Sequence, residues 1–257
     1  MKIFSWNVNS VKARQDRLLA FLKRENPDYL CLQELKGVDE TFPRELVTAA
    51  GYHSETYGQK TYNGVAILSR EKPLETVRGF LDEHATDQQS RALGAKFAWG
   101  WLFSLYVPNG QSVDSDKYVY KLEWLKRLNA FLTKGGYANE ATILAGDFNI
   151  APDDRDCHDP AAWEGQVLCS EPERAAFKAL TALGYHDLFR KFNEAPGTFS
   201  WWDYRNLGFP KNRGMRIDLL LGSAKVAAAA VASGVARDER KGPLPSDHAP
   251  VWAEVKL

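Results

Sequence analysis

The sequence has few cysteines, no excess of charge of either sign and no long apolar run. The three cysteines, Cys31, Cys157 and Cys169, are an odd number at unrelated spacings, so they predict neither a disulfide framework nor a zinc site. The 33 basic and 33 acidic residues cancel, which argues mildly against a polyanionic partner. Acidic metal ligands can hide a basic surface in that total, however, so the balance decides little.

Targeting and membrane-spanning segments are also missing from the pattern. The chain turns polar soon after Met1, without the apolar stretch of a signal peptide, and the run Val226–Ala232 is too short to cross a bilayer. Neither GxGxxG nor GxxxxGKS/T occurs, which excludes the common glycine-rich nucleotide loops. We therefore expect a soluble, cytoplasmic protein that contacts no membrane and, with no oligomerisation pattern in view, a monomer.

Short apolar runs alternate with amphipathic stretches along the whole chain, without a linker rich in proline, glycine or serine, which predicts a single domain over residues 1–257. Strands are predicted at Lys2–Val8, Tyr29–Gln33, Gly64–Ser69, Ala92–Phe97, Trp101–Val107, Ala141–Gly146, Ile217–Leu221 and Val251–Val255. Helices are predicted at Arg14–Asn26, Asp116–Thr133 and Glu173–Leu183, the last after a capping-box pattern that begins at Ser170. The fold class is α/β (α+β in some schemes), and the strands at 64–69, 92–97 and 101–107 imply some antiparallel pairing because no helix separates them.

Polar side chains stand where several of these apolar runs end. Residues at the ends of strands can converge on one edge of a sheet, where a rigid scaffold holds them. Carboxylate and amide oxygens are the ligands of hard divalent cations such as Mg²⁺ or Mn²⁺, and a set with one histidine and no cysteine is a poorer match to zinc. The residues are Asn7, Glu34, Asp147, Asn149, Asp218, Asp247 and His248.

Each of these residues also has an ordinary explanation when it is taken alone. Glu34 is as readily a surface charge, and the segment Gly146–Asn149 could instead be a turn, although that is the less favoured reading. A lone histidine such as His248 is more often a hydrogen-bonded, half-buried residue than a functional one. A shared site explains all of them together better than a coincidence at the ends of so many apolar runs.

The motifs around these residues follow one another over nearly the whole chain. They are Ser5–Ser10, Leu32–Lys36, Tyr106–Gly110, Gly146–Pro152, Phe199–Arg205, Arg216–Asp218 and Ser246–Val251. In content and order they resemble the bacterial exonuclease III family of the endonuclease/exonuclease/phosphatase superfamily. The resemblance implies a four-layer α/β sandwich, in which two mixed β-sheets pack face to face with helices outside.

The same resemblance implies that water attacks a phosphodiester of double-stranded DNA with the help of Mg²⁺ or Mn²⁺. Expected activities are cleavage 5′ to abasic sites, 3′→5′ removal of nucleotides and clearance of 3′ blocks, including 3′ phosphates. Glu34 would be the principal metal ligand, with Asn7 and Asp247 nearby. Asp147, Asn149 and His248 would offer a second metal position, which leaves the choice between one metal and two open.

Catalytic roles follow from the same match. Asp147 would act as general base or proton carrier, and Asn149 would orient the water or hold a phosphoryl oxygen. Asp218 would accept a hydrogen bond from His248 and favour its protonated, phosphate-binding form. Tyr106 would donate to the phosphate or assist the leaving group, although a core tyrosine is the commoner reading of such a position.

Further positions match the family's contacts to DNA. Lys36, Arg91 and Asn109 would contact phosphates, and an aromatic and basic loop between Trp201 and Arg216 would lie against the duplex. Trp201 and Met215 would wall the pocket for an extruded base-less sugar, with Arg205 and Arg213 beside them. The alternative is a surface loop with ordinary packing aromatics.

Three questions stay open from the sequence. His158 is a candidate for narrowing the site and shifting the balance among the three activities. A phosphoinositide phosphatase or sphingomyelinase-like enzyme of the same fold is a rival, although a lipid enzyme should show an apolar membrane-facing loop. A non-catalytic DNA-binding module is a second rival, but every matched catalytic position is filled here.

Overall fold

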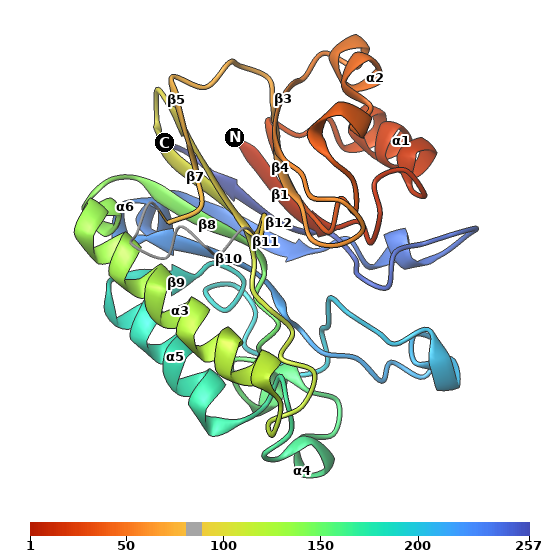
Figure 1. Cartoon of the computed structure of the whole chain (residues 1–257), viewed down its shortest axis with the longest axis vertical. Helices are drawn as coiled ribbons and strands as arrows, with labels where there is room; N and C mark the ends of the chain where they lie inside the picture. The colour runs from red at the N-terminus through yellow and green to blue at the C-terminus, as the bar shows by residue number, and fades with distance from the viewer. Residues whose placement is uncertain (81–88) are drawn as a thin grey trace.

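The computed structural model of the chain, described here for residues 1–80 and 89–257, has four layers (Figure 1). Two six-stranded mixed sheets pack face to face, and helices cover their outer faces. The predicted α/β class and the expected four-layer sandwich are therefore confirmed. Within those described ranges, none of the helices is both long enough and apolar enough to cross a membrane.

The first sheet has the strand order β11-β12-β1-β2-β4-β3. Its strands are β1 (Lys2–Asn7), β2 (Tyr29–Gln33), β3 (His53–Tyr57), β4 (Val65–Ser69), β11 (Ala230–Val235) and β12 (Val251–Val255). Helices α1 (Gln15–Glu25) and α2 (Arg44–Ala49) lie on its outer side in Figure 1. Phe21 of α1 packs there against Phe4 and Trp6 of β1, so the apolar face of the helix is buried on the sheet.

The second sheet has the order β5-β6-β7-β8-β10-β9. Its strands are β5 (Glu75–Arg78), β6 (Ala92–Phe97), β7 (Gly100–Tyr106), β8 (Thr142–Asp147), β9 (Tyr185–Asp187) and β10 (Asp218–Ser223). The remaining helices are α3 (Asp116–Gly135), α4 (Pro160–Trp163), α5 (Glu171–Ala182) and α6 (Ala224–Ala229). Of these, α3 and α5 run together along the outer side of the sheet in Figure 1. Short 3-10 turns cover Asp39–Thr41, Tyr137–Asn139, Asp154–Asp156, Arg205–Leu207 and Arg237–Arg240.

The two sheets share one pairing pattern. Each has a central parallel pair, β1 with β2 and β7 with β8, and antiparallel pairs on both sides of it. Parallel neighbours need a crossover, and here α1 and α3 supply it. Between the sheets, Cys31 and Ile67 of the first pack with Ile143 and Leu220 of the second in one buried apolar cluster. This core fixes the two parallel pairs against each other.

The predicted elements are present, and their bounds are close. The predictions for β2, β6 and β12 match the structure to the residue, and the other predicted strands shift by one or two residues. The expected antiparallel pairing joins β6 and β7, whereas β4 belongs to the other sheet. The predicted helices are present as α1, α3 and α5, and the capping box between Ser170 and Glu173 begins the last of them.

Candidate active site

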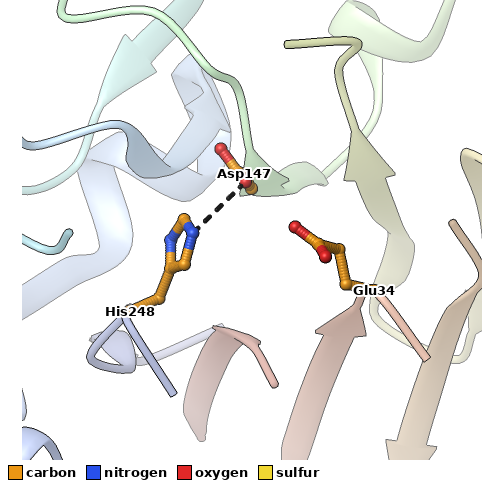
Figure 2. A group of neighbouring side chains, drawn as sticks. All are labelled: Glu34, Asp147 and His248. Carbon is orange, nitrogen blue, oxygen red and sulfur yellow. Dashed lines mark ion pairs between the residues drawn. The ribbon is translucent and has the colours of Figure 1, made fainter. Parts of the chain in front are cut away.

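The site lies where the central strands of both sheets end. Asn7 is the last residue of β1 and is paired with Gln33 at the end of β2, directly before Glu34. In the other sheet, Tyr106 ends β7 opposite Asp147 at the end of β8. Because parallel neighbours end at the same edge, the two pairs bring their polar residues together. Figure 2 shows Glu34, Asp147 and His248, from three separate elements, pointing toward one another.

Glu34 is held by three neighbours. Its Oε1 accepts hydrogen bonds from the Asn7 amide and the Tyr106 hydroxyl, both at 2.9 Å, and its Oε2 lies 2.9 Å from the Lys36 ammonium. Burial alone would raise the pKa of Glu34, but the Asn7 hydrogen bond and the Lys36 charge outweigh it and lower that pKa. Glu34 is therefore a carboxylate near neutral pH.

Asp147 is almost completely buried, with 1% of its surface exposed. Its Oδ2 accepts a 2.9 Å hydrogen bond from the Asn7 amide, and its Oδ1 accepts a 2.9 Å bond from the backbone N–H of Asn149. Burial raises the pKa of Asp147 to about 7, against the opposing charge of His248 and with help from that of Asp218. A carboxylate that titrates near neutral pH is well matched to taking and releasing a proton.

His248 lies between two carboxylates. Its Nδ1 is 2.9 Å from Oδ2 of Asp218, and its Nε2 is 3.8 Å from Oδ2 of Asp147. Burial lowers the pKa of His248, but Asp218 and Asp147 more than compensate and raise it to about 10. The imidazole is therefore a cation near neutral pH. A protonated ring nitrogen cannot bind a metal, so these contacts favour the phosphate-binding role of His248 over the metal-binding one.

Asp247 and its neighbour Asn9, together with Asn149, complete the site. Oδ1 of Asp247 accepts from the Asn9 amide at 2.8 Å, and Oδ2 accepts from the Trp201 indole N–H at 3.0 Å. Burial raises the pKa of Asp247, yet the His248 charge and these hydrogen bonds bring it below its ordinary value. The Asn149 side-chain amide donates to the carbonyl of Val107 at 3.0 Å.

The Asn149 side-chain oxygen accepts from the Asn109 amide at 3.0 Å. These bonds fix the Asn149 amide in one orientation. Tyr106 is half-buried beside the acidic groups, and desolvation of its phenol, together with the charges of Glu34 and Asp147, raises its pKa well above the ordinary value. The phenol is therefore a neutral hydrogen-bond donor.

The donor chemistry fits a hard divalent cation. Ligand atoms of Glu34, Asp147 and His248 all lie within 4.8 Å of one another, and the oxygen donors are carboxylates. Glu34 and Asp147 suit Mg²⁺ or Mn²⁺, and Asp247 is a further carboxylate of the site. The Asn7 amide nitrogen faces both Glu34 and Asp147, while its oxygen accepts from the Asn9 backbone, so Asn7 orients those carboxylates.

The predicted DNA-binding residues divide by exposure. Lys36 bonds Glu34 and Asn9, and the Arg91 guanidinium lies 4.7 Å from the centre of the Tyr106 ring, so both belong to the edge of the site. Arg205 and Arg213 are exposed on the loop.

The two pocket residues also differ from each other. Trp201 is half-buried and bonded to Asp247, but Met215 is fully buried behind it and pairs with its backbone. Met215 therefore supports Trp201 and presents no surface of its own. His158 is exposed beside this pair, with its ring Nδ1 and its backbone nitrogen both 3.1 Å from the Gly214 carbonyl.

Three supporting residues had no role in the sequence-based prediction. Asn9 links Lys36 to Asp247, and the Ser200 hydroxyl accepts from the backbone N–H of Asp218 at 3.0 Å. Asn9 and Ser200 both lie inside the motifs that carry the family resemblance, and this position could have marked them as candidates from the sequence. Lys121 is completely buried, and its signal was its spacing, because it shares the apolar stripe of α3 with Tyr118 and Leu125.

Comparison with known proteins agrees with this geometry. The model of the "Endonuclease/Exonuclease/phosphatase family" matches residues 4–248. Exodeoxyribonuclease III of Haemophilus influenzae is 38% identical over 268 residues, covering 100% of both chains. A 3′ phosphatase of Neisseria, solved with a product DNA hairpin, is 39% identical with a TM-score of 0.97, and an AP endonuclease of Archaeoglobus fulgidus is 35% identical with a TM-score of 0.95; each covers 100% of both chains. The resemblance is confirmed, and this chain belongs to the endonuclease/exonuclease/phosphatase family.

Proposed function

We propose that this chain is a metal-dependent DNA-repair phosphodiesterase of the exodeoxyribonuclease III type. The observation that carries the proposal is the pair of opposite charge states at one strand edge. Asp147 titrates near neutral pH, while His248, 3.8 Å away, is held as a cation by Asp218. Both pKa values are raised, and strongly shifted pKa values in neighbouring buried groups are typical of acid–base sites.

The residues divide the work of phosphodiester hydrolysis. Asp147 accepts the proton of the attacking water, and Asn149, fixed by Asn109 and Val107, orients that water or a phosphoryl oxygen. His248 neutralises charge on the phosphate, and the Tyr106 hydroxyl donates a hydrogen bond to the phosphate or assists the leaving oxygen. These groups are fixed before substrate binds, which lowers the cost of reaching the transition state.

A divalent metal would be held at Glu34, whose ligand atom lies within 4.8 Å of those of Asp147 and His248, with Asp247 as a further carboxylate of the site. The metal would neutralise charge on the phosphate and stabilise the departing 3′ oxygen. We propose Mg²⁺ or Mn²⁺ because the donors are carboxylates. The Asn7 amide donates to both Glu34 and Asp147 and so orients these two carboxylates.

Double-stranded DNA with abasic sites or blocked 3′ ends is the proposed substrate. Names of the relatives support it: one is an exodeoxyribonuclease III, one a 3′ phosphatase solved with DNA and one an AP endonuclease. Lys36, Arg91 and Asn109 lie at the edge of the site, where they would contact phosphates, and Arg205 and Arg213 extend that surface on the exposed loop. Trp201, supported by Met215, would wall the sugar pocket. That the protein is a monomer and is located in the cytoplasm stays a prediction.

The proposal is tested with two labelled duplexes, one with a single internal abasic-site analogue and one with a 3′ phosphate at a nick. Each is incubated with Mg²⁺, Mn²⁺ or EDTA, and the products are separated on a gel. We expect incision 5′ to the analogue that leaves a 3′ hydroxyl, removal of the 3′ phosphate, and neither reaction in EDTA. No reaction on either duplex with both metals would overturn the proposal. A parallel incubation with phosphoinositides tests the lipid rival, which would be favoured if phosphate were released from these lipids alone.

A further inference from the structure

A fully buried lysine lies directly behind the site. Lys121 is on α3, on the face that packs against the second sheet, and its side chain is 0% exposed. It is the only lysine with a buried side chain in the part of the chain that the structure describes, residues 1–80 and 89–257. Lysine is among the residues least often buried, so its partners should explain its position.

The Lys121 ammonium has three acceptors, one for each of its protons. One is the carboxylate of Glu173, which is in close contact and equally buried. The other two are backbone carbonyls, that of Asn109 at 3.0 Å and that of Asn149 at 2.6 Å. These are the two residues whose side-chain amides bond each other at the edge of the site. One cation therefore ties together the loops that follow β7 and β8.

Glu173 anchors this cation to a rigid element. It stands in the first turn of α5, where a negative charge is favourable. Its Oε1 accepts from the backbone N–H of Leu168 at 3.0 Å, and its Oε2 accepts from the backbone N–H of Ser170 at 3.1 Å. The carboxylate is thus fixed independently of Lys121, and the contacts run without a gap from α5 to the site.

The backbone held by Lys121 is unusual at both positions. Asn149 has a φ of 49°, in the left-handed region that costs most residues energy, and its carbonyl bonds Lys121. Gly110, next to Asn109, has a φ of 93°, and a side-chain carbon there would lie 3.1 Å from Cδ of Lys121. The lysine side chain therefore fills the space beneath both loops and also holds their peptides in these conformations.

We propose that Lys121 and Glu173 are a positioning pair that holds the amides of Asn109 and Asn149 in the orientation needed at the reacting phosphate. The inference rests on the proposed function and concerns residues that touch no substrate. A buried ion pair adds little net stability compared with apolar groups of the same size, so stability alone does not account for it. Displacing a positioned group by about 1 Å can cost about 100-fold in rate, which gives the pair its importance.

The main test removes both charges at once with Lys121→Met and Glu173→Gln in one chain, so that neither is left unpaired. Leu132→Ala is the matched control, because Leu132 is also buried on α3 but packs in the apolar cluster under the second sheet. Thermal unfolding, DNA affinity and the single-turnover rate of abasic-site incision are measured well below both melting temperatures. We expect the double variant to lose about 30- to 100-fold in rate with nearly unchanged affinity, while the control loses stability but keeps its rate.

A thermodynamic cycle with Asn149→Ala separates positioning from general damage. If the pair acts through Asn149, removing the pair in the Asn149→Ala background changes the rate little further. Rate losses that multiply, or a double variant as fast as the Leu132→Ala control, would overturn the inference. If the double variant does not fold, Glu173→Gln alone replaces it in the same cycle, with the same criterion.

The failure of this inference differs visibly from that of the proposed function. A wild-type protein that cuts neither duplex would overturn both. An active wild type with multiplying losses would overturn the positioning role alone.

Discussion

Two parts of the site differ in how their side chains are held: the ends of the central strands, called the edge below, and the loop between Trp201 and Arg216. At the edge, Asp147, Asp218 and His248 are almost fully buried, and each is fixed by charged or polar neighbours. On the loop, Arg213 is exposed and Arg205 bonds Asp203, two residues away, with 83% of its side chain exposed. The difference supports the proposed division of roles, in which the residues at the strand ends perform the chemistry, which needs fixed positions and shifted pKa values, and the loop binds the substrate.

The largest effect is expected at the edge, from Asp147→Asn. The change keeps the shape but removes the proton acceptor, so the single-turnover rate should fall by about 10²- to 10⁴-fold. Affinity for an abasic duplex should hardly change, because the loop and the phosphate contacts are intact. The single-turnover rate and the binding affinity, measured on the same duplex, check this. Equal losses in both would contradict the division of roles between edge and loop.

Asp218→Asn should have the next largest effect. Without the carboxylate that holds its proton, His248 becomes neutral near pH 7, and the phosphate loses a cation. We expect the single-turnover rate to fall by about 100-fold. A rate within threefold of the wild type would mean that the charge of His248 is not used.

The same variant changes how stability depends on pH. The pKa of His248 is raised to about 10 from 6.5, so its contribution to stability is complete below pH 6.5 and is lost as pH rises through 10. The melting temperature of the wild type, measured in EDTA, should therefore fall over that interval. Asp218→Asn should melt lower near pH 7 and show a shallower fall. An unchanged profile would contradict the raised pKa.

A smaller effect is expected on the loop, from Arg213→Gln. Loss of one phosphate contact should weaken DNA binding by about threefold to tenfold and reduce the slope of log affinity against log salt by about 1. The single-turnover rate at saturating protein should stay the same. Titrations at several salt concentrations check this, with Lys126→Gln as control because Lys126 is also exposed but lies on α3.

The smallest effect is expected from His158→Gly. His158 stands over the Gly214 carbonyl, next to Met215, so removing its ring should widen the proposed sugar pocket. We expect the ratio of abasic-site incision to 3′-phosphate removal to rise a few-fold, with total stability unchanged. An unaltered ratio would remove His158 from the account of specificity.

The sequence predicted the inner strands of both sheets well and the outermost strands not at all. β1, β2, β4, β6, β7, β8, β10 and β12 have strong apolar runs because both of their faces are covered. The four strands that were missed, β3, β5, β9 and β11, are the outer strands of the two sheets. They are short or partly exposed, so the apolar pattern is weak there.

The site divides in the same way. Residues at strand ends, such as Glu34 and Asp147, were predictable because they follow apolar runs within known motifs. Lys121 was harder to predict. Its spacing places it on the buried face of α3, but a lysine on a helix is expected at the surface, and its partners come from distant segments. Nor does the sequence reveal that Met215 is covered by Trp201, because that depends on how the loop packs.

One paired measurement tests the division between edge and loop most directly. Single-turnover incision and equilibrium binding are determined on one abasic duplex for the wild type, Asp147→Asn and Arg213→Gln. We predict that Asp147→Asn loses its rate and keeps its affinity, while Arg213→Gln keeps its rate and loses affinity. If Asp147→Asn cuts as fast as the wild type, or if both variants change the same quantity, chemistry and recognition are not divided between edge and loop.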